Sequence, residues 1–78
     1  HFKQDNSTAL RYFKMAADKG NPIGQAGMGQ MYFYGSGIER DYSKALKFFQ
    51  LSADQGYVEG HFFLGIMYFF GNGVRKDY

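Results

Sequence analysis

Apolar residues recur at helical spacing in four segments of the chain, and each segment is closed by a glycine. Leu10, Phe13 and Ala17 form the first such stripe, in which successive members lie three or four positions apart. Glycine ends helices readily because it adopts left-handed backbone angles at little steric cost. The pattern predicts helices over residues 7–19, 22–34, 42–55 and 58–70, with Asn6 or Ser7 capping the first, Asn21 capping the second, and Gly20, Gly35, Gly56 and Gly71 as stops.

The second half of the chain repeats the first half at an offset of 36 residues. When residues 1–42 are aligned with 37–78, 17 of the 42 pairs are identical. A period in the mid-thirties is the length of one helix–turn–helix unit. We therefore expect an all-α fold, a right-handed α–α superhelix (solenoid) of four antiparallel helices. The matched apolar pairs predicted to form its core are Leu10/Leu46, Phe13/Phe49, Met31/Met67 and Tyr32/Tyr68.

Four glycines lie at matched positions inside the predicted helices, as the pairs Gly24/Gly60 and Gly29/Gly65. Each interior glycine costs about 1 kcal/mol relative to alanine, so a repeated glycine needs a repeated cause. We expect these glycines to allow neighbouring helices to approach closely, with a bulky aromatic side chain over the missing Cβ. Gly27 is matched by Phe63, and we expect it to be tolerated without such a role.

Composition narrows the function classes. Nine Phe and seven Tyr in 78 residues, with 45% hydrophobic residues, indicate a packed domain. The absence of cysteine excludes disulfides and thiolate metal sites. A net charge of +2 is too small and too scattered to indicate nucleic-acid binding, and no apolar run is long enough to span a membrane. We also expect no direct contact of this segment with a membrane. Because the chain starts without Met and ends abruptly, we expect it to be a segment of a longer protein.

No residues form a recognisable catalytic or cofactor-binding constellation. His61 lies beside two phenylalanines without a nucleophile to pair with, and we interpret it as a surface or packed residue. Asp18 and Asp54 recur at helix ends, where the repeat accounts for them. The glycine run 24–29 has the wrong order for a dinucleotide loop and follows a helix instead of a strand. We therefore expect neither enzyme activity nor a cofactor or metal.

Two matched segments resemble a known family. Met28-Gly29-Gln30-Met31-Tyr32 and Leu64-Gly65-Ile66-Met67-Tyr68 each precede a Gly-x-Gly-Ile/Val loop, and Ala-Asp-x-Gly ends the helix before each. The chain thereby resembles the sel-1-like repeat, a relative of the tetratricopeptide repeat, and is most similar to the central repeats of the vertebrate sel-1 homolog family. In that register, residues 7–20 are the second helix of a preceding repeat, 22–56 one full repeat, and 57–71 the first helix of the next.

The resemblance implies a protein–protein interaction scaffold in the endoplasmic reticulum lumen, within a membrane-anchored parent. Sel-1 homologs act in endoplasmic-reticulum-associated degradation, where they lie beside a membrane ubiquitin ligase and help recruit misfolded glycoproteins. If the chain is the less-studied paralogue, the fold expectation stands and the pathway is open. The residues leave two alternatives: a structural spacer or self-association segment, or an enzyme or small-molecule binder, which would need a closed pocket with converging polar groups.

By the same resemblance, the first helix of each repeat lines the concave side of the array. An exposed apolar strip there would mark a partner site, although the same residues could instead form the core between stacked repeats. Arg11, Lys14, Lys19, Lys44 and Lys47 are expected on a solvated outer face. The positions predicted to face inward are Ile23, Ala26, Gln30, Phe33 and Tyr34 on the second helix, and Glu59, Phe62, Ile66, Phe69 and Phe70 on the fourth.

Asn6 also begins an Asn-Ser-Thr sequence, the acceptor pattern for N-glycosylation. That modification needs an exposed turn in a secretory-pathway protein. The same position suits a helix cap. Both interpretations of Asn6 stay open at the level of sequence.

Overall fold

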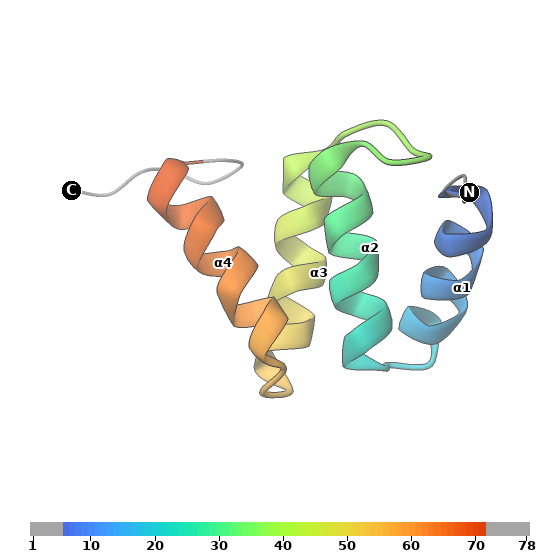
Figure 1. Cartoon of the computed structure of the whole chain (residues 1–78). Helices are drawn as coiled ribbons and strands as arrows, with labels where there is room; N and C mark the ends of the chain where they lie inside the picture. Colours follow the sequence, from blue (N-terminus) through green and yellow to red (C-terminus); the bar gives the residue numbers. More distant parts are fainter. Residues whose placement is uncertain (1–5, 72–78) are drawn as a thin grey trace, which may run out of the picture.

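Four α-helices stand side by side in the computed structural model, which describes residues 6–71 (Figure 1). They are α1 (Asn6–Asp18), α2 (Pro22–Tyr34), α3 (Tyr42–Asp54) and α4 (Val58–Phe70), and no strand forms within those residues. Each helix packs against the one before it. The predicted all-α fold is confirmed, and each helix bound agrees with the sequence prediction to within one residue.

The glycines end the helices as predicted. Gly35 and Gly71 follow α2 and α4 with φ angles of 69° and 73°, in the left-handed region that side chains disfavour. The short turns after α1 and α3 contain Gly20 and Gly56 in the same conformation. The longer loop between α2 and α3 is closed where the backbone N–H of Asp41 donates to a carbonyl near the end of α2. Its repeat after Gly71 lies outside the described residues.

Side chains fix where α2 and α3 begin. The Asn21 Oδ1 atom accepts a hydrogen bond from the backbone N–H of Ile23 at 2.8 Å, which confirms the predicted cap. Asp41 caps α3 in the same way through the backbone N–H of Lys44 at 3.1 Å. The predicted cap of α1 is wrong, because Asn6 is already the first helical residue. The position that matches Asp41 there lies outside the described range.

The core is centred on the Phe49 ring of α3. This ring has no exposed surface and stacks on Phe63 of α4, with centroids 4.8 Å apart and planes 7° from parallel. Ala45 and Met67 complete the buried cluster. Full burial of a phenylalanine side chain contributes about 2–3 kcal/mol, so this ring joins α3 firmly to its neighbours.

Seven of the eight predicted core residues are buried or half-buried. Tyr68 is the exception, with 53% of its surface exposed. The matched Tyr32 of α2 is half-buried because its ring stacks on Phe48 of α3, with centroids 6.0 Å apart. Within the described residues no helix follows α4, so Tyr68 has no such ring beside it.

The interior glycines allow close helix approach at three of the four matched positions. A Cβ atom on Gly24 would lie 2.5 Å from the backbone nitrogen of Ala17, and one on Gly60 would lie 2.7 Å from the matching nitrogen of Ala53. Gly29 lies under the Phe49 ring, where a Cβ atom would come within 2.5 Å of a ring carbon. These contacts confirm the predicted close approach. The expected aromatic ring covers Gly29, but that expectation is wrong for Gly24 and Gly60, where backbone and small side chains lie instead.

Two glycines behave differently from the prediction. Gly65 has nothing within 4 Å of a Cβ built on it, because no described helix lies on that side of α4. Gly27 was expected to be merely tolerated, and this is wrong, since the Phe13 ring of α1 lies directly against it. Gly27 therefore brings α1 close to α2.

A polar cluster ties the end of α3 to the start of α2. The Gln55 Nε2 atom donates to the Gln25 Oε1 atom at 2.8 Å and to the Gly20 carbonyl at 2.9 Å. The Ser52 hydroxyl donates to the Pro22 carbonyl at 2.8 Å. Gln25 and Ser52 are buried, so these bonds satisfy groups that water cannot reach. The repeat did not reveal the cluster, because its side chains, those of Gln25, Ser52 and Gln55, are not matched by identical residues.

The matched glycines predict opposite effects of one substitution. Gly29→Ala should lower the free energy of unfolding by about 1–3 kcal/mol, because the new methyl group meets a buried ring that has no room to move. Gly65→Ala should raise it by about 0.5–1 kcal/mol, because alanine favours the helix and meets no neighbour. Urea denaturation followed by circular dichroism measures both changes. Effects of the same sign would contradict this account of the packing.

The polar cluster predicts that removing the Gln55 side chain destabilises the fold, whereas removing that of Gln50 does not. Gln55→Ala should lower the free energy of unfolding by about 1–2 kcal/mol, because the buried Gln25 amide loses its partner. Gln50→Ala is the matched control, since Gln50 is an exposed residue of α3 whose side-chain amide donates to Asp54 in the same helix. The control should cost no more than about 0.5 kcal/mol in the same denaturation experiment. An equal decrease in the free energy of unfolding for both variants would show that the cluster does not stabilise the fold.

Candidate functional site

The predicted inward strip lies on two helices with different surroundings. Helix α2 packs against both α1 and α3, whereas α4 packs mainly against α3. Matched positions on the two helices can therefore be compared with and without a following helix. Positions exposed on both helices remain available to a partner, and positions exposed only on α4 are those that a following helix covers.

Three matched pairs stay accessible on both helices. Tyr34 and Phe70 have the same exposure, 62%, although only Tyr34 lies on a helix with neighbours on two sides. Ile23 and Glu59 are both exposed, and Gln30 and Ile66 are both half-buried, so they are reachable only in part; the Ile66 side chain also packs against the core cluster. We call these six positions the accessible stripe, and they are the part of the predicted strip that a partner can reach: Ile23, Gln30, Tyr34, Glu59, Ile66 and Phe70.

The remaining two pairs differ between the helices. Ala26 is buried while Phe62 is 61% exposed, so Ala26 cannot contact a partner and its assignment to the binding strip is wrong. Phe33 packs against the core, with its ring centroid 5.8 Å from that of Phe63, whereas Phe69 is 71% exposed. Positions 26 and 33 serve packing on α2, and the matched rings on α4 are uncovered.

A hollow of about 280 Å³ between α1 and α2 adjoins the accessible stripe. It forms where Gly27 replaces the bulky residue of the other repeat, Phe63, whose ring stacks on Phe49 at the matched place. The mismatched pair Gly27/Phe63 was the sequence signal for this hollow, and the expectation that Gly27 had no role missed it. The lining residues are Asn6, Ala9, Phe13, Gly27, Gln30, Met31, Tyr34 and Ser36.

Asn6 lies at the edge of this hollow as the first residue of α1. It is half-buried, and a Cβ atom on Gly37 of the long loop would come within 2.9 Å of the Asn6 Cβ. The glycosylation pattern therefore falls in a helical turn packed against a loop and not in a free turn. A glycan on Asn6 would have to extend away from Gly37 into solvent.

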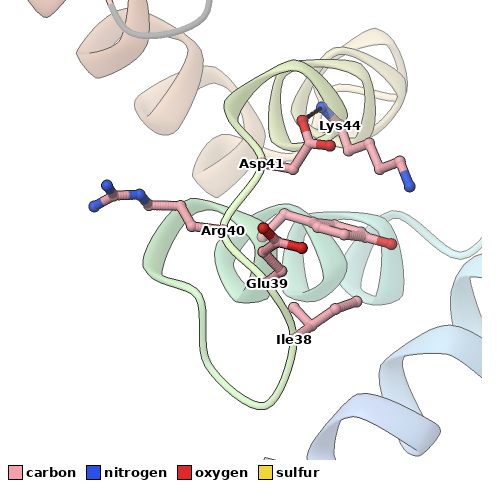
Figure 2. Close-up of a pocket in the computed structure, with 6 residues that line it drawn as sticks. Ile38, Glu39, Arg40, Asp41 and Lys44 are labelled. Atoms are coloured by element: carbon pink, nitrogen blue, oxygen red, sulfur yellow. Dashed lines mark hydrogen bonds between the residues drawn. The ribbon is translucent and has the colours of Figure 1, made fainter.

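A second hollow, of about 360 Å³, lies under the loop between α2 and α3 (Figure 2). Its lining includes Glu39 and Asp41, but the Asp41 carboxylate is occupied in capping α3. The Lys44 ammonium lies 5.5 Å from the centroid of the Tyr32 ring, which is a cation–π contact. Arg40 points away from the hollow in Figure 2, and its guanidinium lies over the Tyr42 ring at 5.2 Å. Asp41 is thus engaged by the start of α3, and Lys44 and Arg40 each lie over a neighbouring ring.

The remaining charged side chains are solvated. All five basic residues assigned to the outer surface are exposed, as predicted. Lys14 pairs with Asp18 at 3.7 Å on the surface of α1, a contact that contributes at most about 0.5 kcal/mol. Within residues 6–71, no three His, Asp or Glu side chains gather in a way that could hold a metal ion. No helix in that range is both long enough and apolar enough to cross a membrane.

The helical array and its paired repeats define the chain as a member of the helical-repeat solenoids, and comparison with known proteins identifies the family. The Sel1 repeat model matches residues 2–21, 22–57 and 58–78, so the chain belongs to the Sel1 repeat family. A solved Sel1 repeat protein from Oxalobacter formigenes is 34% identical, with a TM-score of 0.88. The match covers 97% of this chain and 31% of that protein's chain. A comparison with curated proteins returns no match.

Membership of this family defines the general kind of activity. Sel1 repeats mediate protein–protein interactions and typically form scaffolds instead of enzymes. The accessible stripe agrees with this role, since it offers aromatic and aliphatic surface on a preformed helical array. The family does not specify which partner such a surface receives.

Proposed function

We propose that the chain binds a protein partner through the accessible stripe on α2 and α4. The observation that carries this proposal is the equal exposure of Tyr34 and Phe70, 62% each. Helix α3 packs on α2, yet Tyr34 of α2 is as exposed as Phe70 of α4, which no described helix follows. Aromatic side chains that stay exposed after repeat stacking are suited to contact a partner.

The hollow beside Gly27 suggests what the partner presents. An apolar side chain of a partner segment could enter its 280 Å³, with Phe13 and Met31 as apolar walls. Gln30 and Tyr34 are among the lining residues. A side-chain amide and a phenol hydroxyl can form hydrogen bonds with the backbone of a segment that passes over the hollow. This arrangement favours an extended peptide with one buried apolar anchor.

We further propose that the parent protein acts in the endoplasmic reticulum lumen, as an adaptor in endoplasmic-reticulum-associated degradation. This proposal is supported by the sequence of residues 17–29, which resembles the central repeats of vertebrate sel-1 homologs: Ala-Asp-Lys-Gly-Asn-Pro-Ile-Gly-Gln-Ala-Gly-Met-Gly. The partners would then be a membrane ubiquitin-ligase complex or misfolded glycoproteins. Because a bacterial protein shares the fold, the fold alone does not select this pathway.

A spacer or self-association role is the second candidate. The observation that favours it is the exposure of Phe62 and Phe69, at positions that α2 uses for packing. These rings lie outside the accessible stripe, so partner binding and self-association use different residues and can be tested separately.

The partner-binding proposal predicts a loss of binding without a loss of fold. Tyr34→Ala combined with Phe70→Ala should weaken binding of the partner at least about tenfold, since exposed aromatic anchors commonly contribute more than 1 kcal/mol each. Leu51→Ala is the control, because Leu51 is exposed on α3 outside the stripe. The measurement is quantitative mass spectrometry of lumenal proteins retained by each immobilised variant, followed by titration of the proteins that differ.

Two results would contradict these proposals separately. Unchanged retention by the double variant, with an unchanged circular dichroism spectrum, would remove the accessible stripe as the binding surface. Recovery of partners that include no ubiquitin-ligase component and no glycoprotein would leave the stripe intact and contradict the proposed pathway.

A further inference from the structure

Charge is distributed unequally between the helices. Helix α2 has no charged residue and α4 has one acidic residue, Glu59, whereas α1 and α3 each have two basic residues and one aspartate. The two aspartates lie at the helix ends, where Lys14 pairs with Asp18 and Gln50 donates to Asp54. The surface that α1 and α3 form is therefore basic, and it attracts acidic partners.

A hollow of about 370 Å³ lies on the exposed surface of α3. Its lining residues are Leu46, Lys47, Gln50 and Leu51, and we call it the α3 hollow. Leu46 is half-buried and packs against the core cluster, whereas the other three residues are exposed. Residues 46 and 50 belong to one ridge of the helix surface, and residues 47 and 51 to the next. The α3 hollow thus lies in the groove between two adjacent ridges, which is where a ridge of a second helix packs most commonly.

Neighbouring units of the array leave the α3 hollow open. Helix α3 lies in the middle of the row, between α2 and α4 (Figure 1). Helix α1 has α3 as the next helix of its own kind, yet no Cα atom of α1 lies within 8 Å of one of α3 among the described residues. Leu10 is half-buried like the matched Leu46, and Met15 is 57% exposed against 49% for the matched Leu51. Adding units in the same way therefore does not cover this face of α3.

From its shape and its charge, we propose that the α3 hollow receives an acidic amphipathic helix of a protein partner. An apolar side chain of that helix enters the hollow between Leu46 and Leu51, as side chains of packed helices do. Carboxylates beside this anchor pair with Lys47, and the other basic residues of α1 and α3 favour the approach of an acidic segment. This surface is separate from the accessible stripe, so the two binding functions do not depend on each other.

A protein helix fits this surface better than a lipid bilayer does. Helices that bind membranes project bulky apolar side chains into the bilayer. The aromatic residues of α3, which are Tyr42, Phe48 and Phe49, are instead half-buried or buried. The apolar surface at this site is a hollow, and a hollow receives a side chain.

The proposal is tested by fluorescence anisotropy, with a labelled peptide titrated by the 78-residue chain. The probe has about 15 residues of glutamate, alanine and leucine, with the leucines at helical spacing. We expect a dissociation constant on the order of 10–100 µM. Two comparison peptides should each bind at least about tenfold more weakly. In one, lysine replaces each glutamate and meets like charge, and in the other, serine replaces each leucine and removes the anchor.

Two variants of the chain test the two parts of the contact. Leu51→Ala should weaken binding of the acidic probe at least about fivefold, because the hollow loses an apolar wall. Lys47→Glu should weaken it about three- to tenfold, because attraction becomes repulsion. Lys19→Glu is the matched control, since it makes the same change of net charge at an exposed residue just after α1. Its effect should stay within about twofold, because solvent and salt screen a distant charge.

A third variant separates this proposal from the accessible stripe. Tyr34→Ala with Phe70→Ala should bind the acidic probe as the wild-type chain does, because neither residue lines the α3 hollow. Circular dichroism spectra should be unchanged for every variant, since all the altered side chains are exposed.

Four outcomes would overturn the proposal. The acidic probe could fail to bind at about 1 mM, or it could bind no better than the lysine peptide or the serine peptide. Leu51→Ala and Lys47→Glu could both bind it as tightly as the wild-type chain. Equal weakening by Lys47→Glu and Lys19→Glu would indicate attraction by net charge alone. Binding to vesicles of phosphatidylcholine with about 30% phosphatidylserine, without binding of the acidic probe, would make this face a membrane contact.

Discussion

The arrangement of this chain depends on one aromatic ring held between a glycine and a second ring. Phe49 of α3 lies on Gly29 of α2 and stacks on Phe63 of α4 at a centroid separation of 4.8 Å. A single side chain therefore joins three consecutive helices. Without a Cβ at position 29, the α3 backbone can lie close enough for the ring to be fully enclosed. In a chain of 78 residues, which has few alternative core residues, such a contact carries much of the tertiary stability.

The elements of the fold were predictable because they depend on local chemistry. Glycine after each helix and Asn21 before α2 act within a few residues of their position, so the helix bounds follow from the sequence. The 36-residue identity added the tertiary pattern, because a repeated unit packs in a repeated way. The polar cluster around Gln55 was not predictable, since its hydrogen bonds join residues 30 and 35 positions apart and the side chains of Gln25 and Gln55 have no identical counterparts in the repeat.

The candidate site was predictable only in part, for a related reason. Helical spacing places Ala26 and Phe33 on the same face as Ile23 and Tyr34, but spacing does not show which side of that face a neighbouring helix covers. The structure divides the face because α2 and α4 have different neighbours. The mismatch of Gly27 with Phe63 was visible in the sequence, yet its result, a hollow beside Tyr34, depends on how the Phe13 ring lies.

The polar cluster also helps to determine the order in which the units of a repeat array pack. Rings and glycines recur at the same offset, so by apolar packing alone one unit could replace another. The bonds from Gln55 to Gln25 and to the Gly20 carbonyl are specific to one junction. A shuffled array would leave the Gln25 amide buried beside a lysine or another non-matching side chain. Side-chain hydrogen bonds of this kind make each junction between units specific. They favour packing between units that are adjacent in the sequence.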